Sequence, residues 1–285
     1  GDGMFKAPDN APFMADLPGS GALGTQVYWY DVASENLTET RNVVIWLPPG
    51  YAENPEQRYK VIYMTDGENL FDPRIASWGV DWGVDEAMMR GVNEGKFEPA
   101  IVVGTWSTAN RGLEYSPWHD GPRYADFLIE ELMPRINAEF RTMTGGEHTF
   151  AMGSSMGGLL SYYLVKNHHE VFSACGCVSS HFALSEQVFA EYSGSDPESA
   201  DPRPYIVRDI EAGDRIPGGR FFFDYGTETL DSTYEKDHEP VERWFRKQGL
   251  SKNRDYRFEK YDGADHSERA WRSRIDEQLE WLLGE

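Results

Sequence analysis

Residues 153–157 read Gly-Ser-Ser-Met-Gly, a G-x-S-x-G pattern in which a serine stands on a tight turn between a strand and a helix. Glycine is needed two positions before and two positions after the serine, because side chains there would collide across the turn. The pattern predicts that the Ser155 hydroxyl points away from the sheet and that the backbone N–H of Met156 faces a developing oxyanion. Ser155 is therefore the candidate nucleophile, and Met156 is a candidate oxyanion donor.

The sequence on either side of this turn supports the same local structure. Residues 147–153 form a short run that can be a buried strand, and apolar residues recur at helical spacing after the serine until His168. A plain Gly-Ser turn that opens an ordinary helix is the alternative. The order of strand, turn and helix favours the catalytic interpretation.

Strands and helices alternate along most of the chain, which predicts an α/β fold. We expect an N-terminal antiparallel hairpin, followed by a mostly parallel sheet of about eight strands with helices on both faces. The predicted strands are residues 25–32, 41–47, 60–64, 100–106, 147–153, 173–179, 220–225 and 256–261. The predicted helices, besides the one after Ser155, are residues 84–92, 124–140, 234–249 and 268–283.

The chain is expected to form a single domain over residues 25–285. An irregular arm rich in Pro, Gly, Ala and Asp precedes it at residues 1–24. Residues 181–218 interrupt the alternation with a polar, proline-rich insertion. An insertion of this length is either a surface loop or a small cap over the site.

The composition limits the partners of the protein. Its net charge of −21 comes from 48 acidic and 27 basic residues, so its surface repels nucleic acid and anionic membranes. A run of ~20 apolar residues, which a membrane-spanning helix needs, is not present. The lysine-poor, acidic surface fits an ordinary acidic enzyme or one adapted to salt.

Residues 1–4 show no signal peptide, but a leader removed earlier would leave no trace, so cytoplasmic and exported locations both stay open. The oligomeric state is not indicated.

Two cysteines, Cys175 and Cys177, lie in one predicted strand. Residues i and i+2 share a strand face at a spacing of roughly 6.5–7 Å, the outer limit for a disulfide. Two thiols are also too few for a zinc site. We expect both to be small core residues, and we expect neither a metal nor a cofactor.

A nucleophilic serine needs a histidine base and a carboxylate that orients it. In the α/β-hydrolase order, the acid follows the serine and the histidine follows the last strand. His266 lies in the polar loop after residues 256–261 and is the candidate base. Two carboxylates, Glu228 and Asp231, follow the strand at 220–225, and we prefer Asp231 as the acid.

The second oxyanion donor is expected in the loop after the third strand, which reads Thr65-Asp-Gly-Glu-Asn-Leu-Phe-Asp72. Gly67 permits an unusual backbone turn there, and the N–H of either Glu68 or Asn69 could then face Ser155. A plain Asp-Gly turn is the alternative.

Several motifs together resemble the "putative esterase" branch of the α/β-hydrolases. This branch includes enterochelin-esterase-like proteins, feruloyl and acetyl xylan esterases, S-formylglutathione hydrolase and the mycolyltransferases. The resemblance spans roughly residues 25–283 and is carried by Pro48-Pro-Gly-Tyr51, the stretch from Tyr63 to Asp72, Arg111-Gly-Leu-Glu-Tyr-Ser-Pro117, Gly153-Ser-Ser-Met-Gly-Gly158, Gly226-Thr-Glu228 and Gly263-Ala-Asp-His266. Related esterases often carry the acid as Gly-Thr-x-Asp, which would place it at Thr229. Threonine cannot serve, so the choice between Glu228 and Asp231 stays open.

The resemblance implies a serine esterase that forms an acyl-enzyme without a cofactor and acts on a small ester, with a short-acyl, aryl or carbohydrate group. Acyl transfer to another alcohol, or a non-catalytic binding module on the same fold, are the alternatives.

The resemblance also places a segment containing Arg111, Glu114 and Tyr115 near the mouth of the site. An Arg111–Glu114 pair that braces the loop is preferred over contact with the substrate, although both Arg111 and Tyr115 are pocket candidates. His181 and the tryptophans Trp78, Trp82 and Trp106 are further candidates for the pocket wall.

Overall fold

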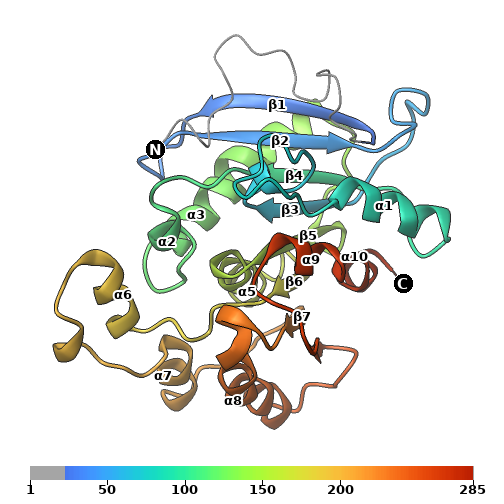
Figure 1. Cartoon of the computed structure of the whole chain (residues 1–285). Helices are drawn as coiled ribbons and strands as arrows, with labels where there is room; N and C mark the ends of the chain where they lie inside the picture. Colours follow the sequence, from blue (N-terminus) through green and yellow to red (C-terminus); the bar gives the residue numbers. More distant parts are fainter. Residues whose placement is uncertain (1–22, 285) are drawn as a thin grey trace.

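The computed structural model describes residues 23–284 (Figure 1). The predicted arm at residues 1–24 therefore lies outside the described residues, except for its last two positions. Within the described part of the chain, no helix is long and apolar enough to cross a bilayer.

Eight strands form one sheet in the order β1-β2-β4-β3-β5-β6-β7-β8. β2 pairs antiparallel with β1 and β4, and every other pair of neighbouring strands is parallel. This arrangement confirms the α/β-hydrolase fold and its N-terminal antiparallel hairpin. The strands are β1 (Thr25–Val32), β2 (Arg41–Leu47), β3 (Val61–Thr65), β4 (Ile101–Thr105), β5 (Thr149–Ser154), β6 (Ala174–Val178), β7 (Arg220–Tyr225) and β8 (Tyr256–Lys260).

The central strands are continuous apolar runs because helices cover both of their faces. All residues of β2, β3, β4, β5 and β6 are buried, whereas β1 at the edge alternates between buried and more exposed positions. Side chains of alternate parity enter two separate hydrophobic clusters, one on each face.

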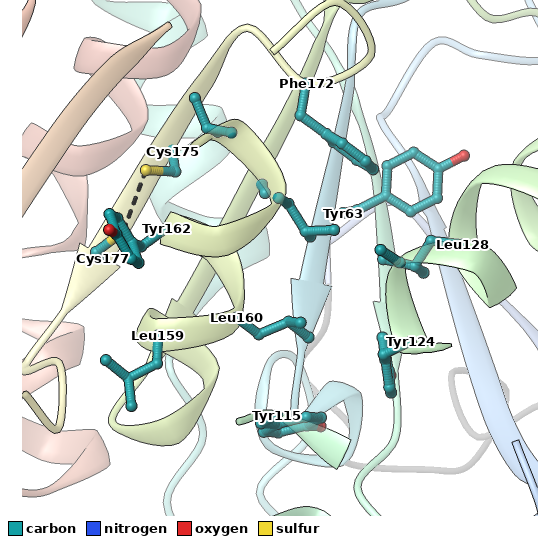
Figure 2. Close-up of a cluster of buried hydrophobic side chains, with 14 of the residues drawn as sticks. Tyr63, Tyr115, Tyr124, Leu128, Leu159, Leu160, Tyr162, Phe172, Cys175 and Cys177 are labelled. Atoms are coloured by element: carbon teal, nitrogen blue, oxygen red, sulfur yellow. Dashed lines mark hydrogen bonds between the residues drawn. The ribbon is translucent and has the colours of Figure 1, made fainter. Parts of the chain in front are cut away.

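One cluster lies under the helices that follow β4, β5 and β7. Figure 2 shows part of it, where Tyr63 of β3 meets Phe172 edge to face at 5.9 Å. The helices on this side are α3 (Gly121–Asp126), the π-helical turn η4 (Phe127–Leu132), α4 (Met133–Glu139), α5 (Met156–Asn167) and α8 (Tyr234–Lys247). The first three form the predicted helix at 124–140, which begins earlier, at Gly121.

The opposite face is covered by α1 (Val84–Asn93) and α10 (Ile275–Leu283). The single helix predicted over residues 268–283 is wrong, because it is split into α9 (Glu268–Arg272) and α10. At the break, Arg274 has a non-helical φ of −128°. Its side chain turns inward to Ser179 and Asp224 instead of continuing the helix face.

Cys175 and Cys177 of β6 are buried free thiols, as the strand spacing predicted. Their sulfur atoms lie 3.1 Å apart beneath Tyr162 of α5 (Figure 2).

The insertion at residues 181–218 is largely helical. It contains α6 (Glu186–Ser193), a short turn η6 (Pro197–Ser199) and α7 (Tyr205–Glu211), and α7 lies beside α8 in Figure 1. The Ser185 hydroxyl caps α6 by accepting the N–H of Val188 at 3.1 Å. Aromatic contacts attach the segment to the body: Phe189 stacks on His119 with a centroid distance of 4.2 Å.

Candidate active site

Ser155 occupies a strained turn between β5 and α5. Its φ of 57° and ψ of −119° lie in a region that non-glycine residues rarely adopt. Its N–H donates to Val178 O at 2.9 Å, and its carbonyl accepts the N–H of His181 at 3.3 Å. A Cβ atom at Gly153 would lie 2.4 Å from Thr65 Oγ1, and one at Gly157 only 2.1 Å from the same atom. The two glycines are therefore required by close approach to β3.

His266 and Asp231 come together from two loops at the carboxyl ends of β8 and β7. The distance between His266 Nδ1 and Asp231 Oδ1 is 2.6 Å. Asp231 lies in the 3₁₀ turn η7 (Thr229–Thr233) and is 1% exposed. Thr229 Oγ1 accepts the backbone N–H of His266 at 2.9 Å and so holds the histidine loop. Glu228 is exposed on the same loop, so Asp231 is the carboxylate that contacts the imidazole.

The environment of Asp231 favours its ionised form. Burial by itself would raise the pKa of this carboxyl, but hydrogen bonds from His266, Ser179 and the Gly226 backbone outweigh burial and lower it. The second oxygen accepts Ser179 Oγ at 2.6 Å and Gly226 N at 2.7 Å. An anionic Asp231 fixes the imidazole proton on Nδ1, which leaves the Nε2 lone pair free.

A buried polar network behind Asp231 was not predicted from the sequence. Ser179, at the end of β6, accepts hydrogen bonds from Trp271 Nε1 at 3.1 Å and Arg274 Nη2 at 2.7 Å. The same Arg274 nitrogen donates to Asp224 Oδ1 at 3.1 Å, and Gln278 donates to Asp224 Oδ2 at 2.8 Å. Three segments far apart in the sequence, the end of β6, the end of β7 with the loop after it, and α9 with α10, therefore meet behind the His266–Asp231 pair.

The loop after β3 holds the two candidate backbone donors, and the N–H of Glu68 lies close to the carboxyl group of its own side chain. The N–H of Asn69 is already bonded to Asp66 O at 2.9 Å, which leaves the N–H of Glu68 as the candidate. Met156 is the first residue of α5, where an N–H has no acceptor within the helix. Gly67 is needed for packing, since a Cβ there would lie 2.5 Å from Gly104 O.

The Glu68 side chain is turned into the protein and is 1% exposed. Its two oxygens accept Ser107 N at 3.0 Å and Ser107 Oγ at 2.5 Å. Burial, together with the nearby Asp66 carboxylate, raises the pKa of Glu68 to about 8 despite these hydrogen bonds. The carboxyl group is therefore mostly protonated at neutral pH.

The expected Arg111–Glu114 pair is wrong. Both residues belong to the single helical turn α2 (Arg111–Glu114), but their side chains bond to different segments, the loop after β3 and strand β2. Arg111 forms a two-pronged ion pair with Asp66, at 2.8 and 2.9 Å. Glu114 forms a buried one with Arg41 of β2, at 2.7 and 3.1 Å. Residues distant in the sequence, Arg41 in β2 and Asp66 just after β3, supplied closer partners than the neighbouring turn.

Three of the predicted pocket residues do not line the site. One of them, Trp82, is 1% exposed and packs against Trp271 with a ring-centroid distance of 5.4 Å. Tyr115 is fully buried behind the Arg111 guanidinium, and its hydroxyl accepts the N–H of Asp66 at 3.3 Å. Trp106 is buried on the other side of the sheet, where it meets Tyr28 edge to face at 6.3 Å. These aromatic side chains pack in the core. Their positions in the sequence alone did not show whether they would pack there or line the pocket.

Two pockets of about 480 Å³ each meet at Ser155 and Arg111. The polar pocket is lined by His266 and by further charged and aromatic side chains: Asp66, Glu68, Arg111, Glu268, Trp78 and Trp271. The apolar pocket is lined mainly by Leu113, Met156, His181, Leu184, Phe189 and Leu230. Side chains of the helical insertion, Leu184 and Phe189, thus form part of the second pocket.

His181 is a neutral member of the apolar pocket. Its Nδ1 lies 2.7 Å from the Tyr234 hydroxyl, and burial, followed by the neighbouring His266, lowers its pKa to about 4. Within residues 23–284, no group of three or more His, Cys, Asp or Glu side chains is arranged to hold a metal ion.

Comparison with known proteins identifies the family. The family described as "Putative esterase" matches residues 34–282. An endo-1,4-β-xylanase/feruloyl esterase of Xylanibacter ruminicola is 26% identical over 159 residues, which are 54% of this chain and 22% of that protein. The chain thus spans only about a fifth of that curated relative.

Solved structures agree in fold. A ferulic acid esterase is similar with a TM-score of 0.70 at 21% identity, over 92% of this chain and 98% of that one. A CE1 ferulic acid esterase of Anaeromyces mucronatus, solved with ferulic acid, has a TM-score of 0.65 at 18% identity, over 98% and 94% of the two chains. Since the family match covers most of the sequence, this chain belongs to the putative esterase family of α/β-hydrolases.

Proposed function

We propose that this chain is a serine carboxylic ester hydrolase in which Ser155 is the nucleophile, His266 is the base and Asp231 orients the base. The observation that carries the proposal is the 2.6 Å contact between His266 Nδ1 and Asp231 Oδ1, at a pocket that also contains the strained Ser155. Membership in an esterase family supports the same chemistry.

The acylation step follows from the tautomer that Asp231 imposes. Ser155 Oγ attacks the ester carbonyl carbon while its proton moves to His266 Nε2. The carbonyl oxygen becomes an oxyanion, which the backbone N–H groups of Met156 and Glu68 would stabilise. When the tetrahedral intermediate collapses, the bond from carbon to the alcohol oxygen breaks, and His266 returns the proton to that oxygen. The acyl group stays on Ser155 as an ester.

Deacylation repeats the sequence with water as the nucleophile. His266 takes one proton from the water as the hydroxide attacks the acyl carbon, and Ser155 Oγ leaves with that proton. The products are a carboxylic acid, an alcohol and the free enzyme. Every proton is accounted for by side chains of this chain and water.

Aryl and carbohydrate esters are the proposed substrate class. The apolar pocket, at about 480 Å³, lies in the range of pockets that enclose small ligands, and its leucine and phenylalanine lining suits an aryl or short aliphatic group. The names of the relatives favour hydrolysis over transfer, since those compared are feruloyl or ferulic acid esterases.

The test is Ser155→Ala, assayed with p-nitrophenyl acetate, methyl ferulate and an acetylated sugar. We expect kcat to fall by about 10⁴-fold or more, because a triad member is lost, and we expect labelling by a fluorophosphonate to disappear. The melting temperature should change little, since alanine keeps the same backbone. Activity within about tenfold of the parent enzyme would remove Ser155 as the nucleophile.

Hydrolysis and transfer are separated by the products. With an added alcohol or sugar acceptor, a hydrolase releases the free acid in nearly constant yield, whereas a transferase diverts the acyl group to the acceptor. Dominant transfer at low acceptor concentration would replace the proposed activity with the alternative one.

A further inference from the structure

His266 lines only one of the two pockets that meet at Ser155, and this asymmetry orients the substrate. The leaving alcohol oxygen must receive its proton from His266 Nε2, so the alcohol part of the ester must enter the pocket that His266 lines. The acyl part then occupies the apolar pocket, where Met156 and Leu230 lie. The reverse placement would put the leaving oxygen on the side away from the proton donor. This step rests on the proposed function.

We infer that the polar pocket binds a neutral or cationic sugar-like alcohol and discriminates against an anionic one, through the Glu268 carboxylate and the Trp78 indole. Glu268 and Trp78 approach the pocket from α9 and from the loop that follows η3 (Gly67–Asn69). Neither residue has a role in the proton transfers of the ester reaction.

Among residues 23–284, Glu268 is the carboxylate of this pocket that has neither an ion pair nor a hydrogen bond from another residue's side chain. Asp66 is neutralised by Arg111 in a two-pronged pair. Glu68 is occupied by Ser107. The Glu268 carboxylate has no ion-pair partner among residues 23–284, although it lines the pocket. It can therefore accept hydrogen bonds from the hydroxyl groups of a sugar or pair with an ammonium group.

The electrostatics of the pocket oppose a second anion. Burial is the largest influence on Glu268 and raises the pKa of its carboxyl; the Asp66 carboxylate acts in the same direction, against the smaller opposing effects of the Glu268 backbone N–H, His266 and Arg111. A carboxylate on the substrate would meet the same desolvation and the same repulsion, with Glu268 itself added. The net charge of −21 acts in the same direction at longer range.

Trp78 gives the pocket a flat apolar wall. Its side chain is 80% exposed, so it is not part of the core. An indole face is negative at its centre and is therefore suited to the C–H face of a sugar ring or to a cation, and unsuited to an anion. The Glu268 carboxylate and the face of the Trp78 ring thus both favour a neutral or cationic sugar-like alcohol over an anionic one.

The test uses one acyl group esterified to four alcohols: methanol, and the methyl glycosides of glucose, glucosamine and glucuronate acylated at the same ring hydroxyl. For the parent enzyme we expect kcat/KM for the glucuronate ester to be about tenfold or more below that for the glucose ester. Glu268→Gln should narrow this difference. The ratio of kcat/KM for the glucose ester to kcat/KM for the glucuronate ester should fall at least several-fold. The matched control, Glu228→Gln, removes an exposed charge that lines neither pocket and should leave the ratio unchanged. Because the ratio compares two substrates of one variant, any effect of Glu268 on His266 cancels.

A second variant tests the indole without risk to the fold. Trp78→Ala should raise KM for the glucose ester by about three- to tenfold and leave the methyl ester unaffected, since methanol does not reach the ring. Equal losses on both esters would overturn the role of Trp78.

Failure of the inference is distinguishable from failure of the proposed function. Normal turnover of the methyl ester, with equal kcat/KM for the glucose and glucuronate esters or a ratio unchanged in Glu268→Gln, would overturn the inference alone. If no ester is turned over, the preference of the pocket can still be measured. Ligand-observed NMR then compares the affinities of methyl glucoside and methyl glucuronide for Ser155→Ala. Equal binding of the two would also overturn it.

Discussion

Replacing Asp231 by asparagine gives the sharpest test of how the base is oriented. The substitution keeps the shape of the side chain and removes its charge. In the native protein, Oδ2 accepts Ser179 Oγ and the Gly226 N–H, while Oδ1 faces His266 Nδ1 at 2.6 Å. An asparagine that keeps its oxygen on the first two donors must point its NH₂ group at the imidazole.

The expected magnitude follows from this geometry. Two N–H donors cannot pair, so His266 must shift its proton from Nδ1 to Nε2, and Nε2 can then no longer accept the serine proton. The negative charge that stabilises the imidazolium is also lost. We expect kcat to fall about 10³- to 10⁴-fold, as in other triads with a neutralised acid, which corresponds to roughly 4–5.5 kcal/mol of barrier.

The assay is kcat at saturating p-nitrophenyl ester, with the rate of fluorophosphonate labelling as a second readout. Glu228→Gln is the control, because Glu228 is exposed and does not contact the ring, and it should lose less than about tenfold. A loss below about tenfold in Asp231→Asn, or a larger loss in Glu228→Gln, would refute the orientation argument.

Two further substitutions test the buried charges around the site. Burial raises the pKa of Glu68 from 4.5 to about 8, so the stability that its protonated form contributes is complete below the lower value and is lost as pH rises through the higher one. Glu68→Gln should keep both hydrogen bonds to Ser107 and flatten the fall in melting temperature over that range, and parallel curves for the two proteins would contradict this reasoning. Arg274→Ala leaves Asp224 buried without its cation and should lower the free energy of unfolding by about 3–5 kcal/mol, measured by urea denaturation. Arg254→Ala, at a side chain that is 77% exposed, should change it by less than about 0.5 kcal/mol, and an equal loss would show that the buried pair is not special.

Features carried by local sequence were predictable. The structure around Ser155 is local, because the strand, the G-x-S-x-G turn and the helix follow one another within twenty residues. The two glycines of the motif are required because larger side chains would collide across this one turn, so the motif can be recognised in the sequence. The parallel strands were recognisable because burial on both faces demands continuous apolar runs. His266 was found in its expected loop because chain order places the histidine after the last strand.

Features that depend on partners distant in the sequence were not predictable. Arg111 and Glu114 lie on one turn, yet their ion pairs are with Asp66 and Arg41. The break between α9 and α10 depends on Arg274, whose partners lie at the ends of β6 and β7. Glu268 was missed for the same reason, because only the folded chain brings α9 to the loop after β3.

The position of Asp231, the proposed acid, shows how a carboxylate can reach the histidine from a spacing that departs from the one usual in related esterases. The position where related esterases often carry the acid holds Thr229, which adopts a left-handed backbone with φ of 53° and accepts the N–H of His266 through its hydroxyl. The carboxylate comes two residues later but stays close, because residues 229–233 form a 3₁₀ turn. Such a turn advances about 2.0 Å per residue, against about 3.3 Å in a strand. Glu228 precedes the turn in extended backbone, with φ of −116° and ψ of 160°, and its side chain is exposed. One turn thus presents a hydroxyl to the backbone of the histidine and a carboxylate to its ring.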